Sequence, residues 1–137
     1  MTNLLKLAAL AILIVVAGAL AYVRLAPSDP ARWHEIPEEI TYRDLEGGAM
    51  RRVDGDLAAL DTIIRDTPRT RVLAGSLEEG MVTYVTRSRV FGFPDYTTVR
   101  QAGETLEIYG RLRFGSSDLG VNAARIDRWL ERLQTAG

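Results

Sequence analysis

The residues best suited to chemistry cluster in a short polar loop, residues 115–120, between a predicted strand and a predicted helix. A loop before a helix leaves backbone N–H groups free, and the helix dipole favours an anion there. Arg113 precedes the loop, and Asn122 and Arg125 lie one turn into the helix. A phosphate or carboxylate would suit such a place. The candidate ligand-binding residues are Arg113, Ser117, Asp118, Asn122, Arg125 and Asp95.

The same residues have a simpler structural interpretation. Ser117 or Asp118 would cap the helix, Gly120 would permit a tight turn, and Arg125 would pair with Asp118 or with a carbonyl group. We favour this interpretation, because strand–loop–helix junctions need such caps whether or not they bind a ligand.

Known catalytic motifs fit the loop poorly. Its spacing is similar to that of a phosphate-binding P-loop, but the Lys-Ser/Thr ending is missing, so nucleotide binding is not supported. Leu119 stands where a Gly-x-Ser-x-Gly motif needs its last glycine. Asp95 and Asp118 are the one acidic pairing to consider for catalysis. They would serve a hydrolase whose anionic substrate is held by Arg113 and Arg125.

The inventory of reactive side chains is small. The chain has no cysteine and one histidine, His34, and Lys6 is its single lysine. Thiol nucleophiles, disulfides, Cys-zinc sites and iron–sulfur clusters are excluded, and we predict no catalytic residue, metal or cofactor. The net charge of -1 gives no pull toward nucleic acid. We attribute the excess of arginine over lysine first to codon composition and second to anion recognition.

The chain from residue 40 onward predicts one α+β domain. An apolar stripe from Leu57 to Ile64 indicates a first helix, capped by Asp54 and ended by Pro68. Four strands follow, at about 71–76, 81–88, 95–101 and 105–113, and a second helix begins at Val121. Residues 40–53 are ambiguous and contain short strands at most. We expect a two-layer fold, an antiparallel four- to five-stranded sheet with two helices on one face. The other face would carry some of Arg87, Arg100, Tyr109, Arg111 and Arg113.

The first 25 residues predict a membrane anchor. Residues 7–23 carry no charge, and the apolar run from 4 to 25 is long enough to span a bilayer. A cleaved signal peptide is the alternative, because residues 19–21 fit a cleavage site. Either way the rest of the chain is transferred across the membrane. We therefore predict an inner-membrane protein with its domain in the periplasm. Residues 26–39 contain three prolines and predict a semi-rigid spacer, in which Trp33 is either an interfacial anchor or packed on the domain.

The final third of the chain resembles a known family. Residues 93–95, and then Arg113-Phe-Gly-Ser-Ser-Asp-Leu-Gly-Val-Asn-Ala-Ala-Arg125, are similar to the pattern of the bacterial and plastid family called domain of unknown function 1499. Tyr109, Gly110 and Leu112 replace the Arg, Ser and Ser of that pattern, and its Asn-Cys-Val-Ser-Ser element is absent. The resemblance implies a bacterial, often membrane-anchored domain and implies no activity.

Together these observations predict a membrane-anchored module that binds and does no chemistry of its own. Its partner would be a protein or a small anionic ligand. A carboxylate-based hydrolase and a lipid carrier, with lipid held between helices and sheet, are the alternatives.

Overall fold

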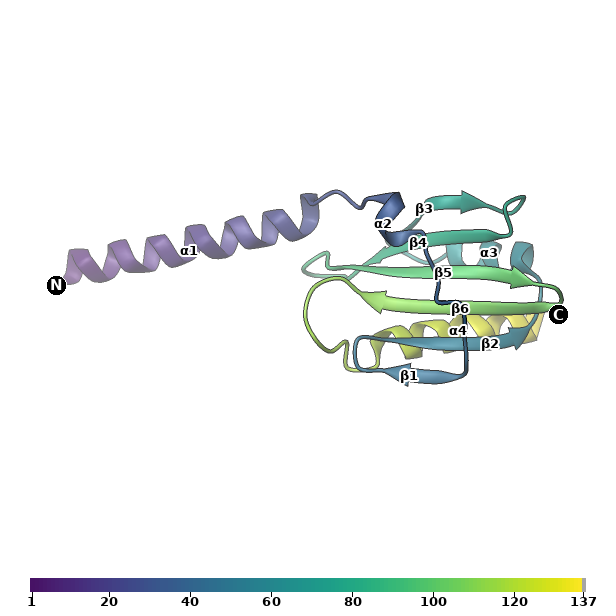
Figure 1. Ribbon diagram of the computed structural model, residues 1–137. Helices are drawn as coiled ribbons and strands as arrows, with labels where there is room; N and C mark the ends of the chain where they lie inside the picture. Colours follow the sequence, from purple (N-terminus) through teal and green to yellow (C-terminus); the bar gives the residue numbers. More distant parts are fainter. Residues whose placement is uncertain (137) are drawn as a thin grey trace.

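The computed structural model describes residues 1–136, which form an α+β domain preceded by a long apolar helix (Figure 1). That helix, α1 (Thr2–Leu25), extends away from the domain and is exposed along most of its length. It is long and apolar enough to cross a membrane, with a mean hydropathy of 2.6 over its most apolar window. A signal sequence would satisfy the same criterion.

The sheet has six strands, where the sequence predicted four to five. All neighbours are antiparallel, in the order β1-β2-β6-β5-β4-β3. The extra strands come from the ambiguous segment, which forms a hairpin that pairs with β6 far along the chain. The strands are β1 (Arg43–Leu45), β2 (Gly48–Asp54), β3 (Thr70–Ser76), β4 (Met81–Arg87), β5 (Pro94–Ala102) and β6 (Thr105–Leu112).

Two helices cover one face of this sheet, as predicted: α3 (Leu57–Arg65) and α4 (Val121–Ala136). The cap of α3 is Asp56, which accepts a hydrogen bond from the Ala59 N–H, and not Asp54, which ends β2. The core between helices and sheet is filled by apolar side chains, among them Leu60, Ile64, Leu106, Ile108, Ile126 and Trp129.

The opposite face of the sheet is covered by residues 26–40, which we call the strap (Figure 1). Trp33, at the end of the short helix α2 (Pro30–Trp33), stacks on Tyr96 of β5, with ring centroids 4.0 Å apart and planes 12° apart. Arg111 of β6 lies beneath and donates hydrogen bonds to the Trp33 and Glu35 carbonyl oxygens. The strap is therefore part of the fold. The expectation of a semi-rigid spacer is wrong, and of the two interpretations of Trp33, packing on the domain is confirmed.

The strap also supplies hydrogen-bond acceptors to the arginines beneath it. Burial lowers the pKa of Arg111 to about 10, yet carbonyl and hydroxyl oxygens accept its N–H groups, including Thr98 Oγ1 at 2.8 Å. Arg100 likewise donates to the Pro37 and Glu38 carbonyl oxygens. These arginines thus hold the strap and are not free to bind a ligand.

Replacing Trp33 tests the strap. We expect Trp33→Ala to lower the free energy of unfolding by about 2 kcal/mol, because a half-buried aromatic stack is lost. Leu77→Ala, in the exposed β3–β4 turn, is the control and should change stability by less than about 0.5 kcal/mol. Urea unfolding of the full chain in mild detergent, followed by far-ultraviolet circular dichroism, measures both. Equal stability of the two variants would mean that the strap contributes nothing.

Candidate functional site

The predicted polar loop folds back on the start of α4 through the side chain of Asp118. Its Oδ1 accepts the Gly120 N–H at 2.9 Å, and its Oδ2 accepts the backbone N–H and the side-chain amide of Asn122 at 3.0 and 2.9 Å. Asn122 is fully buried. Both carboxylate oxygens of Asp118 therefore accept hydrogen bonds at the start of α4, which is the capping role that the sequence suggested.

Arg125 extends this cluster from α4 to the sheet. Its Nη1 donates to Asn122 Oδ1 at 3.0 Å and to Asp95 Oδ2 on β5 at 3.2 Å. Arg125 is 8% exposed, so this ion pair is largely shielded from solvent. The sequence predicted Asp118 or a carbonyl group as the partner of Arg125, and the structure gives Asp95 and Asn122 instead.

Two carboxylates thus lie in one cluster, in which Asp95 pairs with Arg125 and Asp118 is linked to Arg125 through Asn122. The pKa of Asp95 is raised above its ordinary value, chiefly because burial disfavours the charged form and also because Asp118 is a nearby like charge. The attraction of Arg125 opposes this rise without cancelling it. A closed cluster of this kind fixes α4 against β5, and its polar atoms point at one another.

Arg113 and Ser117 lie outside the cluster. Arg113 is on the strap side, where its Nη1 donates to the Pro27 carbonyl oxygen and to the Tyr96 hydroxyl. Ser117 is exposed, and its Oγ accepts the Leu119 N–H at 3.3 Å. Of the six predicted ligand-binding residues, the structure brings together Asp95, Asp118, Asn122 and Arg125.

A different, open site lies at the end of the domain next to α1, and we call it the arginine groove. It consists of two hollows of about 580 and 670 Å³, which share Arg69, Arg87, Ser88 and Arg89. Five arginines line the first and six line the second. The eight different arginines are Arg24, Arg69, Arg71, Arg87, Arg89, Arg125, Arg128 and Arg132.

The pairing of β3 with β4 gathers the middle of this groove. Arg69-Thr70-Arg71 begins the hairpin, Arg87-Ser88-Arg89 ends it, and Thr70 is opposite Thr86. The Arg87 N–H donates to the Arg69 carbonyl oxygen at 3.0 Å, and Arg69 Nε donates to the Arg87 carbonyl oxygen at 3.1 Å. Two Arg-x-Arg pairs at the open ends of a predicted hairpin are a signal that sequence reasoning missed by attributing arginine to codon composition.

Most of these guanidinium groups lack an acidic partner. Within residues 1–136, no carboxylate lies within 4.0 Å of the guanidinium nitrogens of Arg24, Arg69, Arg71, Arg87, Arg89 or Arg128. Asp66, paired with Arg132, is the single acidic residue among the described residues that line the groove. Like charges held close together repel one another, so the groove favours an incoming anion.

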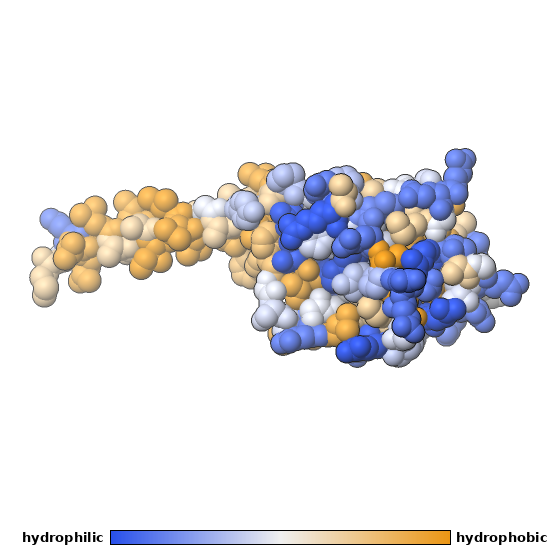
Figure 2. Space-filling model, viewed as in Figure 1, coloured by the Kyte–Doolittle hydropathy of each residue, from blue (hydrophilic) through white to orange (hydrophobic). Residues whose placement is uncertain are grey.

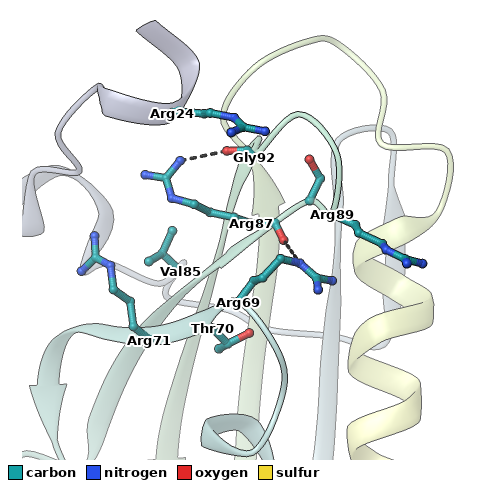
Figure 3. Close-up of a pocket in the computed structure, with 9 residues that line it drawn as sticks. Arg24, Arg69, Thr70, Arg71, Val85, Arg87, Arg89 and Gly92 are labelled. Carbon is teal, nitrogen blue, oxygen red and sulfur yellow. Dashed lines mark hydrogen bonds between the residues drawn. The ribbon is translucent and has the colours of Figure 1, made fainter. Parts of the chain in front are cut away.

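Figure 3 shows how the first hollow is arranged. Arg71 and Arg87 extend on either side of Val85, and Arg24 reaches in from the end of α1. Arg87 is held by a hydrogen bond from Nη1 to the Gly92 carbonyl oxygen at 2.8 Å. Arg69 and Arg89 point toward α4 and connect this hollow to the second one.

Comparison with known families matches residues 23–133 to the family described as "Protein of unknown function (DUF1499)". The chain belongs to this family. The match includes the strap as well as the sheet and both domain helices, which agrees with the strap being part of the fold. No curated protein and no solved structure matches the chain. The run Asp118 to Arg125, which resembles the family pattern, supplies three of the four residues of the closed cluster at the start of α4.

No metal site is present in the part of the chain that the structure describes, where no three His, Asp or Glu side chains are suitably grouped. The single histidine, His34, belongs to the strap. Its Nδ1 lies 2.8 Å from Thr83 Oγ1, and its Nε2 lies 2.9 Å from Glu79 Oε1.

Substitution of Asp118 tests the structural role of the family motif. We expect Asp118→Asn to lower the free energy of unfolding by about 1–3 kcal/mol, because buried N–H donors lose a charged acceptor. Ser117→Ala is the matched control in the same loop and should cost less than about 0.5 kcal/mol. Urea unfolding of the full chain measures both. An Asp118→Asn variant as stable as the wild type would contradict the capping role.

Proposed function

We propose that this chain is a membrane-anchored extracytoplasmic binding domain, which holds an anionic ligand in the arginine groove and does no chemistry of its own. The observation that carries the proposal is the convergence of arginines from α1, from both ends of the β3–β4 hairpin and from α4 on one open groove. Six of them have no acidic partner within residues 1–136.

The chemistry of arginine favours a phosphate or carboxylate group as the ligand. A planar guanidinium offers N–H donors in a fork that matches two oxygens of such a group. The hollows, at about 580 and 670 Å³, fall in the size range of small-molecule sites. Val85 and the aliphatic stems of the arginines give the first hollow an apolar floor, which also suits an anion attached to an apolar body.

The membrane part of the proposal is supported by α1. Lys6 and the amino terminus precede its apolar span, and this placement favours a cytoplasmic amino terminus. The domain would then lie on the opposite, periplasmic side of a bacterial inner membrane. Arg24 ends the span and also lines the groove, so the ligand would bind close to the membrane surface.

The two alternative functions are less well supported. A hydrolase would need Asp95 and Asp118 to face a substrate, but both are engaged with Asn122 and Arg125 in a closed cluster. A carrier would need space for lipid between helices and sheet, and that layer is filled by packed side chains.

Titration with inorganic phosphate tests the groove. In the full chain in nonionic detergent at low salt, we expect saturable binding that Arg89→Gln weakens about tenfold, which corresponds to about 1.4 kcal/mol. Arg89 lines both hollows and has no acidic partner among residues 1–136. Arg43→Gln, an equal charge change on the exposed outer strand β1, is the control and should leave affinity unchanged. Absence of binding, or equal weakening by both variants, would refute the groove as an anion site.

Single-cysteine labelling tests the predicted side of the membrane. Because the chain has no cysteine, Leu77→Cys introduces one thiol in the exposed β3–β4 turn. We expect a membrane-impermeant maleimide to label it in cells whose outer membrane alone is permeabilised. Asn3→Cys, before the span, should react only after lysis. The reverse pattern would place the domain in the cytoplasm.

A further inference from the structure

The loop between β4 and β5, residues 88–93, carries apolar side chains that lie alongside α1. Val90 and Phe91 at its tip are 66% and 49% exposed, which is costly in water. They face the membrane helix across a hollow of about 400 Å³. Its lining residues are Ala17, Leu20, Ala21, Arg24, Val90 and Phe91.

The position of this hollow along α1 sets its depth. At 1.5 Å per residue, α1 is about 36 Å long and exceeds the hydrocarbon core of about 30 Å. Arg24 would sit near the headgroups, and Ala17, seven residues earlier, would lie about 10 Å deeper. Side chains level with residues 17–21 are therefore at the depth of the outer acyl chains.

Most backbone polar groups of residues 90–93 form hydrogen bonds within the protein. The Val90 and Phe91 carbonyl oxygens accept hydrogen bonds from Arg24, and the Gly92 carbonyl oxygen accepts one from Arg87. The Phe93 carbonyl oxygen accepts the Ser88 N–H at 2.9 Å. All four carbonyl groups of residues 90–93 thus have partners within the protein, and the N–H groups of Gly92 and Phe93 donate to Ser88, which lowers the cost of placing this segment against hydrocarbon.

Aromatic rings continue from this loop to the helix. Phe91 and Phe93 have ring centroids 5.7 Å apart, Phe93 and Phe114 are 6.4 Å apart, and Phe114 meets Tyr22 of α1 edge-on at 6.0 Å. Figure 2 shows the apolar colours of α1 continuing onto the adjoining end of the domain, whereas the rest of that face is largely hydrophilic. Aromatic side chains are favoured where a protein crosses the membrane–water interface.

We infer that the tip of this loop inserts into the bilayer beside α1 and forms a second membrane contact, with Val90 and Phe91 among the acyl chains. The bilayer is the natural occupant of this surface because the loop is already bonded to Arg24 at the end of the span. The inference rests on the proposed membrane anchor and is independent of anion binding. It places the arginine groove, which shares Arg24 and Gly92 with this end of the domain, at the level of lipid headgroups.

Spin labels on single cysteines test this insertion. The full chain, with Val90→Cys, Phe91→Cys or the control Leu77→Cys, is labelled with a nitroxide and reconstituted in phosphatidylcholine–phosphatidylglycerol vesicles. We expect oxygen to collide with labels at 90 and 91 severalfold more often, relative to a water-soluble nickel complex, than with the label at 77. Using two neighbouring positions guards against one substitution that disturbs the loop.

Each other result would overturn the inference. Water-like accessibility at both 90 and 91, with α1 intact by mass, would show that the loop stays out of the bilayer, while phosphate binding could still hold. Strong spin–spin broadening at 90 and 91 that vanishes on dilution with unlabelled chain would show a second copy on this surface. A purified protein that lacks its first 21 residues would refute the loop insertion and the membrane anchor together.

Discussion

The stack of Trp33 on Tyr96, with Arg111 bonded to the strap beside it, is the contact on which the arrangement of this protein depends. Two helices cover one face of the sheet, and the strap with its single-turn helix α2 lies on the other. The strap covers that face, and its residues Trp33 and His34 form hydrogen bonds with Thr83, Thr98 and Arg111 of the sheet. Because the strap follows α1 directly, the same contacts hold the end of α1 against the domain. The groove and the β4–β5 loop, which both involve Arg24, acquire their shape from this attachment.

The arginines of this protein fall into two groups that differ in burial and in hydrogen-bond partners. Arg111, Arg100 and Arg125 are buried or half-buried, and oxygen atoms of the strap, the sheet or α4 accept their N–H groups. Such arginines hold elements together. Six arginines of the groove have no acidic partner within residues 1–136, and their mutual repulsion costs Coulomb energy that an anion would relieve. Arg125, Asn122 and Asp118 are bonded within one closed cluster, so this run explains the stability of the domain better than its binding.

The proposed anion site and the proposed membrane contact of the loop agree on one orientation of the domain. The loop would enter the acyl chains while the adjoining arginines lie at the headgroups, where the local concentration of anions is high in a membrane with acidic lipids. An arginine groove at that level is in a position to meet anionic groups that diffuse in the membrane plane as well as those in solution. The loop and the groove both involve Arg24. This residue lies at the end of α1, donates hydrogen bonds to the loop and lines the groove.

The sequence by itself determined what depends on neighbours along the chain. The alternation of apolar and polar residues predicted β3 to β6, and the helical spacing of apolar residues predicted α3 and α4. An uncharged run predicted α1. These patterns are local, so the sequence alone shows them. The cap at Asp118 was also predictable, since a cap lies within one turn of its helix. Only the tertiary structure decided what depends on distant pairing. The β1–β2 hairpin is stabilised by β6, which is more than fifty residues away. Arg113 and Arg125 lie on opposite faces of the sheet. Arg69 meets Arg87 only because β3 pairs with β4. The groove belongs to this second class, because no local spacing brings α1, a hairpin and α4 to one end of the domain.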